Sequence, residues 1–408
     1  MHPPLRQKFN AVYTDALFGR YRDWLVERLG PFPFRLAETP LFLSKRLRDH
    51  LAQASLDIVA QLSAPAALGA MMKAIPDEVR APRMSSLPDC VQVDFALVRS
   101  ESGEIEGRVV ELQAFPSLYA METIESDAWN EQLDGEWTCF FNEDRAASIA
   151  LMKQCILGDA TTRSTVLVDF QPHAQKTVPD FKATKLLFDV DSVCVTDIEK
   201  DGKKLYRRVD GKRVAIERIY NRLVFDELAV KGVKMPFDWS DDLDVTWCSH
   251  PNWYWVWSKY SLPHLDHPTV PKTRYLSEIE RIPEDLENYV LKPLFSYAGS
   301  GVIVDVTREA IDAVPENRRS ETILQRKVEY AFAIPMPHAK PGEELGAHNA
   351  IKAEVRMMLM RAGDGPLVPL LPLVRLSRGK MLGVDQNKSA ETAWTGGAVG
   401  IWLSGKGD

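Results

Sequence analysis

The chain has 408 residues, of which 45% are hydrophobic and 26% charged, proportions typical of a globular protein with two or three domains. Its net charge of −7 argues against nucleic acid as a partner. The N-terminus lacks the apolar core of a signal peptide, and no run of about 18 apolar residues occurs, so we expect a cytoplasmic protein without membrane contact. The five cysteines form no CxxC pair, which argues against a structural zinc site or a disulfide framework.

The first 80 residues predict a layer of helices. Apolar residues recur at spacings of three and four between residues 18 and 29, and again between residues 43 and 62. Three prolines, Pro31, Pro33 and Pro40, separate these two stretches. We expect the helices to pack against the rest of the protein.

A β-hairpin is predicted from residues 90–98 and 108–114, two apolar runs joined by a polar turn that contains glycines. Glu111 and Gln113 share one face of the second strand, and Asp94 on the first strand can meet them across the ladder. Three oxygen ligands on one rigid face suit Mg²⁺. The alternative is a solvated hairpin face, but charge inside such apolar strands favours the metal site.

From residue 165 the pattern changes to short β-branched runs and a helix, which predicts an α/β domain. The expected strands are 165–170, 193–198, 204–209 and 215–222, and the expected helix is 224–230. Five tryptophans between residues 239 and 257 predict core or interdomain packing, because few basic residues lie among them. We divide the chain into residues 1–155, 156–260 and 261–408.

The segment around Lys292 has the composition of a polyphosphate-binding hairpin. Lys292 lies in an apolar run that precedes the loop 296–301, and a second, β-branched run, 302–306, follows that loop. Glycine lacks a Cβ atom, so the backbone amides of such a loop can approach phosphate groups closely. No GxxxxGK[ST] motif occurs, so this is not a P-loop. The segment alone is also compatible with an ordinary glycine turn.

Several motifs accompany Lys292 in chain order. They are Ser258-Lys-Tyr260, Val270-Pro-Lys-Thr273, the expected strand 322–328 and Ala353-Glu-Val-Arg356. This series resembles the ATP-grasp superfamily over about residues 160–400, and Ile219-Tyr-Asn-Arg222 resembles the end of the α/β domain that precedes it in that family.

The metal-binding strands that usually end this family are missing at the C-terminus. Asp385-Gln-Asn387 leads instead into Trp394-Thr-Gly-Gly397, which resembles the segment before those strands. The hairpin with Asp94 and Glu111 therefore resembles the circularly permuted arrangement of the glutathionylspermidine synthetase type. The departure is Gln113, where the family usually has asparagine, which puts the metal geometry in question. We expect an α/β (α+β) permuted ATP-grasp fold, with a preceding α/β domain and an N-terminal helical layer.

The resemblance implies an ATP-dependent carboxylate–amine ligase that uses ATP and Mg²⁺ and acts on small-molecule carboxylates and amines through an acylphosphate. It implies phosphate contacts from Lys259, Lys292, Ser296, Gly299, Ser300 and Gly301, and adenine contacts from Gln325, Lys327 and Val328. It implies Mg²⁺ ligands at Asp94, Glu111 and Gln113, and a catalytic arginine at Arg356 or at Arg83.

Two other functions compete with the ligase. One is a phosphotransferase of the same fold that transfers phosphate to a hydroxyl group. The other is a nucleotide-binding module without catalysis, which the glutamine at position 113 favours.

Overall fold

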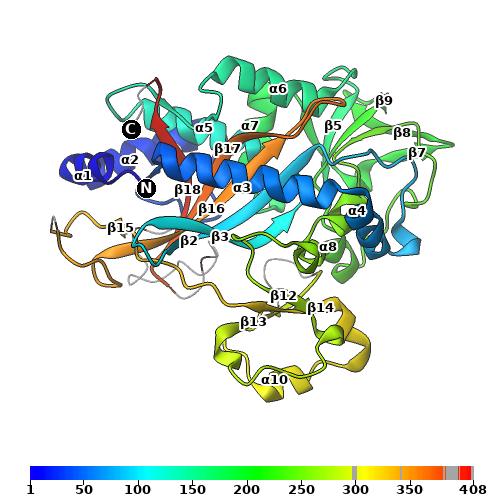
Figure 1. The fold of residues 1–408 in the computed structure, drawn as a ribbon. Coiled ribbons are helices and arrows are strands. Elements are labelled where there is room, and N and C mark those ends of the chain that lie inside the picture. Colours follow the sequence, from blue (N-terminus) through cyan, green and yellow to red (C-terminus); the bar gives the residue numbers. More distant parts are fainter. Residues whose placement is uncertain (296–300, 341, 380–381, 383–393, 395, 406–408) are drawn as a thin grey trace.

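The computed structural model describes residues 1–295, 301–340, 342–379, 382, 394 and 396–405. Its largest element is an eight-stranded sheet with the order β1-β18-β17-β16-β2-β3, in which β4 pairs with β18 and β15 pairs with β16. The strands are β1 (Leu41–Phe42), β2 (Cys90–Arg99), β3 (Ile105–Gln113), β4 (Trp137–Thr138), β15 (Ile334–Pro335), β16 (Ala350–Met360), β17 (Val368–Ser377) and β18 (Gly396–Leu403). The two ends of the sequence thus share one sheet (Figure 1).

The predicted hairpin is confirmed as β2 and β3, and it pairs through β2 with β16. Side chains alternate along a strand, so β2 has two different faces. Val91, Val93 and Phe95 lie on the apolar face and are fully buried. Gln92 and Asp94 lie on the other face, where the antiparallel register sets Arg356 of β16 opposite Asp94.

The predicted N-terminal helices are confirmed as α1 (Pro3–Val12), α2 (Asp15–Leu29), α3 (Lys45–Ser63) and α4 (Pro65–Met71). Ser44 begins α3 by accepting a hydrogen bond from the Leu47 backbone N–H. The helix lies across the apolar face of the large sheet and buries a stripe that includes Leu47, Leu51 and Ile58 (Figure 1). Within the described residues, no single helix is long and apolar enough to cross a membrane; one bent helix pair, Lys45–Ser63 with Pro65–Ala74, meets that test on length and composition alone.

A second, parallel sheet has the order β11-β10-β5-β6. It contains β5 (Thr165–Asp169), β6 (Asp191–Cys194), β10 (Arg218–Asn221) and β11 (Thr246–Cys248), beside α5 (Tyr119–Asn130), α6 (Arg145–Leu157), α7 (Val178–Phe188) and α8 (Phe225–Val230). An antiparallel sheet of β7 (Glu199–Asp201), β8 (Lys204–Val209) and β9 (Lys212–Ile216) follows β6. The expected strand 215–222 is wrong as one element, because the chain passes from β9 into β10 and so changes sheet at Glu217.

A small lobe lies apart from the other sheets (Figure 1). It holds β12 (Thr273–Tyr275), β14 (Thr322–Arg326), β13 (Tyr289–Pro293) and α10 (Arg308–Asp312), with the strand order β12-β14-β13. The expected strand 302–306 is reduced to one bridge, in which Ile303 and Leu291 exchange backbone hydrogen bonds of 2.9 and 3.0 Å. The lobe has its own core around Leu324, Ile311 and Val306.

The segment before this lobe carries the tryptophan-rich stretch. It forms α9 (Trp253–Val256) and a 3₁₀ helix, Lys259–His264. Trp253 and Trp257 are fully buried with ring centroids 5.3 Å apart, so the expected packing role is confirmed for them. The division of the chain at residues 155 and 260 stays a prediction, although the parallel sheet falls between those limits and the large sheet draws strands from both sides of them.

The close approach of α3 to β3 gives a test of this fold. A Cβ atom added at Gly107 would overlap Leu51 Cδ2 and lie 2.9 Å from Phe95 Cδ1. We expect Gly107→Ala to lower the free energy of unfolding by about 1–3 kcal/mol, measured by urea denaturation, because the added methyl group overpacks the core. The matched control is Gly19→Ala in α2, where nothing lies within 4 Å and a gain of about 0.5–1 kcal/mol is expected. Equal effects of the two substitutions would contradict the packing of α3 described above.

Candidate active-site cleft

A cleft of about 1290 Å³ opens where the large sheet, the parallel sheet and the small lobe meet. Among the described residues that line it, ten are lysine or arginine and six are aspartate or glutamate. This surplus of four positive charges contrasts with the net charge of −7 for the whole chain. Clustered charge of one sign in a concave site favours a ligand of the opposite sign, here an anion.

Two lysines reach this cleft from different elements. Lys292 on β13 donates to the Val110 carbonyl at 2.8 Å and to Gln325 Oε1 at 2.6 Å. Burial lowers the pKa of Lys292 to about 8, although the charge of Glu111 opposes this shift. Lys259, at the start of the 3₁₀ helix, lies with its Nζ atom 3.7 Å from Glu111 Oε1 and donates to the Pro293 carbonyl at 3.3 Å. The two lysines predicted to bind phosphate are thus brought together beside one carboxylate.

A buried ionic network forms the floor of the cleft. Arg356 grips Asp94 with two hydrogen bonds, Nε to Oδ1 at 2.6 Å and Nη2 to Oδ2 at 2.7 Å. Arg375 of β17 donates to Asp94 Oδ2 at 3.0 Å and also contacts Glu354. Glu354 in turn accepts from the Tyr330 hydroxyl at 2.6 Å. Burial alone would raise the pKa of Asp94, but the charges of Arg356 and Arg375 outweigh burial and lower it.

These contacts correct the expected magnesium ligands. The Asp94 side chain is 2% exposed, both of its oxygens accept from guanidinium groups, and it is not among the described residues that line the cleft. A metal ion bound to Asp94 would have to displace the guanidinium groups of Arg356 and Arg375, so Asp94 does not fit the role of a metal ligand. With its amide oxygen turned toward Arg356, Gln113 accepts from that guanidinium at 2.8 Å. Glu111 is half-exposed and lines the cleft, so its carboxylate stays accessible to a metal ion.

The residues expected to contact adenine line the cleft beside the small lobe. Gln325 is 2% exposed, and its amide accepts from Lys292 and donates to Thr273 Oγ1 at 3.2 Å. Beyond it, the Lys327 backbone N–H donates to the Asn288 carbonyl at 2.7 Å, and the Ala331 N–H donates to the Leu97 carbonyl at 2.8 Å. The segment that includes Val328 therefore runs along the rim from the small lobe to the large sheet.

Two groups of predicted residues stand outside this arrangement. Ser296, Gly299 and Ser300 of the expected phosphate loop lie outside the described residues, as do 385–387. Gly301 is described, with φ 74°, and a Cβ atom there would lie 3.0 Å from Pro293 Cγ. Arg83 is not among the described residues that line the cleft: it contacts the Leu243 carbonyl and pairs with Asp242 at 3.0 Å. Although Arg83 precedes Asp94 closely in the sequence, its side chain does not line the cleft.

Sequence reasoning missed the half of the cleft beside the parallel sheet. Arg222, 3% exposed, follows β10, pairs with Asp180 and donates to Ser117 Oγ at 3.2 Å. Asp169 ends the neighbouring strand β5, and burial raises its pKa to about 7 although the charge of Arg222 opposes this shift. Both residues lie at the carboxyl edge of parallel strands, where α/β sheets commonly bind ligands. The sequence did carry a signal for this site, because the end of a β-branched run such as 165–170 marks the carboxyl edge of a strand.

Comparison with known proteins returned no matching family model and no matching curated protein. Among solved structures, the chain is similar to a glutathione synthetase-like effector from Globodera pallida in its apo form. The match covers 95% of this chain and 96% of the effector, with a TM-score of 0.56 and 12% sequence identity. The chain has the fold of a glutathione synthetase-like protein. The expected fold is thereby confirmed at the level of a mixed α/β structure with several sheets.

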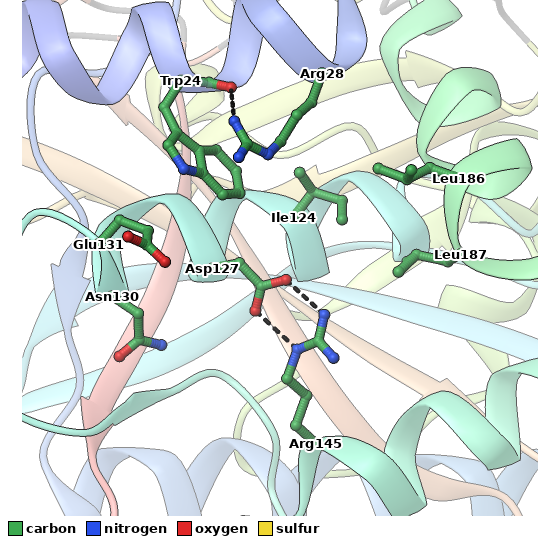
Figure 2. Close-up of a pocket in the computed structure, with 9 residues that line it drawn as sticks. All are labelled: Trp24, Arg28, Ile124, Asp127, Asn130, Glu131, Arg145, Leu186 and Leu187. Carbon is green, nitrogen blue, oxygen red and sulfur yellow. Dashed lines mark hydrogen bonds and ion pairs between the residues drawn. The ribbon is translucent and has the colours of Figure 1, made fainter.

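A smaller hollow of about 400 Å³ lies between α2, α5 and α7 (Figure 2). Three of its charged side chains, Arg28, Asp127 and Arg145, already have partners. Arg145 forms two hydrogen bonds with Asp127, of 2.6 and 2.8 Å, and Arg28 donates to the Trp24 carbonyl at 3.1 Å. None of the residues predicted from the sequence lines it, so we place the functional site in the larger cleft.

The floor network gives the test of this site. We expect Asp94→Ala to lower the free energy of unfolding by about 3–5 kcal/mol in urea at pH 7, because Arg356 is left buried without a counter-ion and Arg375 keeps only Glu354. Because folding lowers the Asp94 pKa, its stabilising effect is present above the unfolded value of about 3.9 and is lost as the pH falls through the folded value.

The control for this substitution is Asp127→Ala, which breaks the more exposed pair with Arg145 and is expected to cost less than about 1 kcal/mol. A cost for Asp94→Ala no larger than that of Asp127→Ala would contradict the buried network.

Proposed function

We propose that the protein is an ATP-dependent carboxylate–amine ligase with a circularly permuted ATP-grasp arrangement. The observation that carries this proposal is the cleft itself, where Lys292 of the small lobe, Lys259 of the 3₁₀ helix before it, and two arginines of the large sheet line one space in an otherwise acidic chain. The likeness in fold to a glutathione synthetase-like protein supports it. So does the place of the β2–β3 hairpin, which completes from the N-terminal side a sheet whose other long strands come from the C-terminal region.

The nucleotide would lie in the half of the cleft beside the small lobe. Lys259 and Lys292 would contact its phosphates. The rim segment with Lys327 and Val328 would contact adenine. Glu111 would hold Mg²⁺, with Gln113 as a neutral neighbour, since this ion commonly takes one or two carboxylates together with phosphate oxygens and water. When bound, Mg²⁺ neutralises charge on the phosphates.

The chemistry would rest on positioning and charge rather than on a nucleophilic side chain. A substrate carboxylate oxygen would attack the γ-phosphorus of ATP, ADP would leave, and an acylphosphate would form. An amine nitrogen would then attack the acyl carbon, and phosphate would leave. Arg356 and Arg375 would face the charge that develops in both steps, and Asp94 would act as a positioning residue that holds both guanidinium groups.

The acceptor substrates would lie beside the parallel sheet. Arg222 offers a guanidinium to a substrate carboxylate at this end of the cleft. Asp169 lines the same region and, with its pKa raised to about 7 by burial, could accept the proton that an attacking ammonium group must lose.

Lys292 gives a binding test of the proposal. Lys292→Met should weaken ATP binding about 10- to 100-fold in calorimetry, because a hydrogen bond to a charged group contributes roughly 1.5–3 kcal/mol. In the unmodified protein, ATP affinity should fall by up to about tenfold per pH unit above pH 8, since the free amine carries no charge. The substitution should remove this pH dependence. Lys204→Met, at the exposed first residue of β8, is the control and should leave both affinity and pH dependence unchanged. An absence of ATP binding to the unmodified protein would refute the proposal.

Product analysis separates the ligase from its rivals. With ATP, Mg²⁺ and paired panels of small carboxylates and amines, we expect an amide, ADP and free phosphate. Glu111→Gln should lower turnover about 100-fold or more, because loss of one electrostatic contact at a reacting centre has an effect of this size. The control, Glu287→Gln at the cleft rim, should leave turnover unchanged. A phosphorylated hydroxyl as the product would identify a kinase instead. Mg²⁺-dependent ATP binding without turnover of any pair would favour the binding module.

A further inference from the structure

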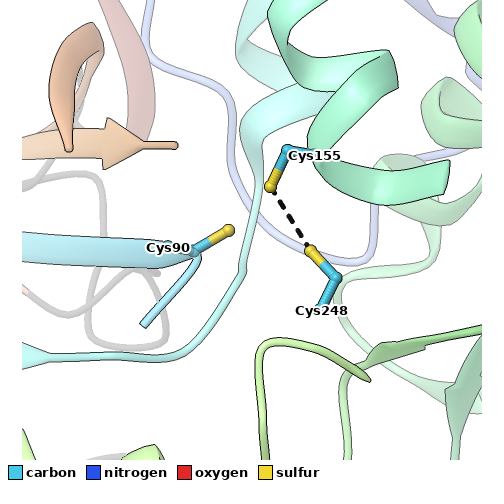
Figure 3. Close-up of side chains that lie close together, drawn as sticks. All are labelled: Cys90, Cys155 and Cys248. Carbon is cyan, nitrogen blue, oxygen red and sulfur yellow. Dashed lines mark hydrogen bonds between the residues drawn. The ribbon is translucent and has the colours of Figure 1, made fainter. Parts of the chain in front are cut away.

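Three buried thiols meet at the junction of the large sheet and the parallel sheet, outside the cleft. Cys90 begins β2, Cys155 lies in the last turn of α6, and Cys248 ends β11. Their sulfur atoms all lie within 4.8 Å of one another, and Figure 3 shows the three side chains directed at a common point. Each residue is at most 1% exposed. Reactive surface thiols are accessible, so this cluster is not a reactive site of that kind.

The spacing of the sulfurs is that of ligands rather than of a covalent bond. The Cys155 and Cys248 Sγ atoms are 3.5 Å apart, and all three cysteines are free thiols. A disulfide requires about 2.05 Å between the sulfurs. Thiolates around a tetrahedral zinc ion, at about 2.3 Å from the metal, lie roughly 3.8 Å from one another. A metal ion therefore fits among these sulfurs with small adjustments.

Hydrogen bonds that do not involve the sulfurs hold the three segments in register. Ser249 Oγ accepts from the backbone N–H groups of Asp89 and Cys90, both at 3.1 Å, and so fixes the end of β11 against the start of β2. The Arg218 guanidinium donates to the Cys155 carbonyl at 2.6 Å and fixes α6 against β10. Sites held by such supporting contacts need little reorganisation to bind a ligand.

The charge around the cluster also suits a thiolate site. Thiolate is the form of cysteine that binds metals. The Arg218 guanidinium, which donates to the Cys155 carbonyl at 2.6 Å, supplies positive charge beside the cluster. Three thiolates around a divalent ion would leave one surplus negative charge, which the guanidinium of Arg218 would offset.

We propose that Cys90, Cys155 and Cys248 bind one thiophilic d¹⁰ metal ion, Zn²⁺ or Cu⁺, which joins the large sheet to the parallel sheet. Soft sulfur ligands select these ions over Mg²⁺ or Ca²⁺. Three sulfurs would complete a trigonal Cu⁺ site. Zn²⁺ prefers a fourth ligand. The Asp89 backbone carbonyl lies 3.9 Å from Cys155 Sγ, whereas the Asp89 carboxylate is not grouped with the three sulfurs and lies 3.8 Å from Arg361 Nη2. The site is structural and independent of the proposed ligase activity.

The first test is the metal content of the full chain, purified under reducing conditions without chelators and measured by inductively coupled plasma mass spectrometry. We expect close to one zinc or copper ion per chain, and the identity of the metal distinguishes the two. Cys155→Ala should lose it. Cys139→Ala is the matched control, because Cys139 is equally buried but lies outside the cluster, and it should retain the metal. Loss from both variants or from neither would overturn the assignment.

The second test does not depend on the variants folding. The unmodified chain, stripped of metal under reducing conditions, is titrated with Co²⁺ and then with Zn²⁺ or Cu⁺. We expect a sulfur-to-cobalt charge-transfer band at one equivalent, its loss on adding Zn²⁺ or Cu⁺, and a higher Tm of the metal-loaded chain. Absence of the band with no bound metal, or a Cys155–Cys248 disulfide in protein trapped directly from cells, would refute the proposal.

Discussion

The site depends on one carboxylate buried between two arginines. Asp94 holds Arg356 and Arg375, which lie 262 and 281 residues away in the sequence, and so it ties the N-terminal hairpin to the C-terminal strands. Removing either kind of partner would leave an uncompensated buried charge, which is far more costly than loss of a surface pair. Asp94 and Glu354 together balance the charges of Arg356 and Arg375, so the network holds the two guanidinium groups at fixed positions.

The cleft has a surplus of positive charge, whereas the chain as a whole has a net negative charge. Lys292 is buried where its ammonium form is disfavoured, which lowers its pKa to about 8. In isolation this burial opposes folding. A bound polyphosphate would reduce that cost, because it would add negative charge to that of Glu111. A site arranged in this way is ready for its ligand before binding and needs little rearrangement, which is the basis of electrostatic preorganisation.

The two faces of β2 show how one strand serves two purposes. Val91, Val93 and Phe95 pack under α3 and anchor the strand in the core. The opposite face carries Cys90 at the thiol cluster and Asp94, which holds the two arginines at the floor of the cleft. The strand thus links the proposed structural metal site with the proposed catalytic site. Its rigidity follows from burial on both faces and pairing on both edges.

The sequence by itself determined the local elements. Spacings of three and four residues identified the N-terminal helices, and apolar runs bounded by turns identified the hairpin and the lysine-bearing strand. Such patterns depend only on near neighbours. The order of motifs around Lys259, Lys292 and Arg356 was enough to assemble much of one half of the cleft.

Only the tertiary structure decided which side chains become partners. The antiparallel register of β2 and β16 turned Asp94 from an expected metal ligand into the anchor of two arginines. The parallel pairing of β5 with β10 brought Asp169 and Arg222 to one edge, and the packing of α6 between two sheets gathered three cysteines that no spacing rule connects. Strand register and layer packing join residues far apart in the chain, and local periodicity carries no record of those contacts.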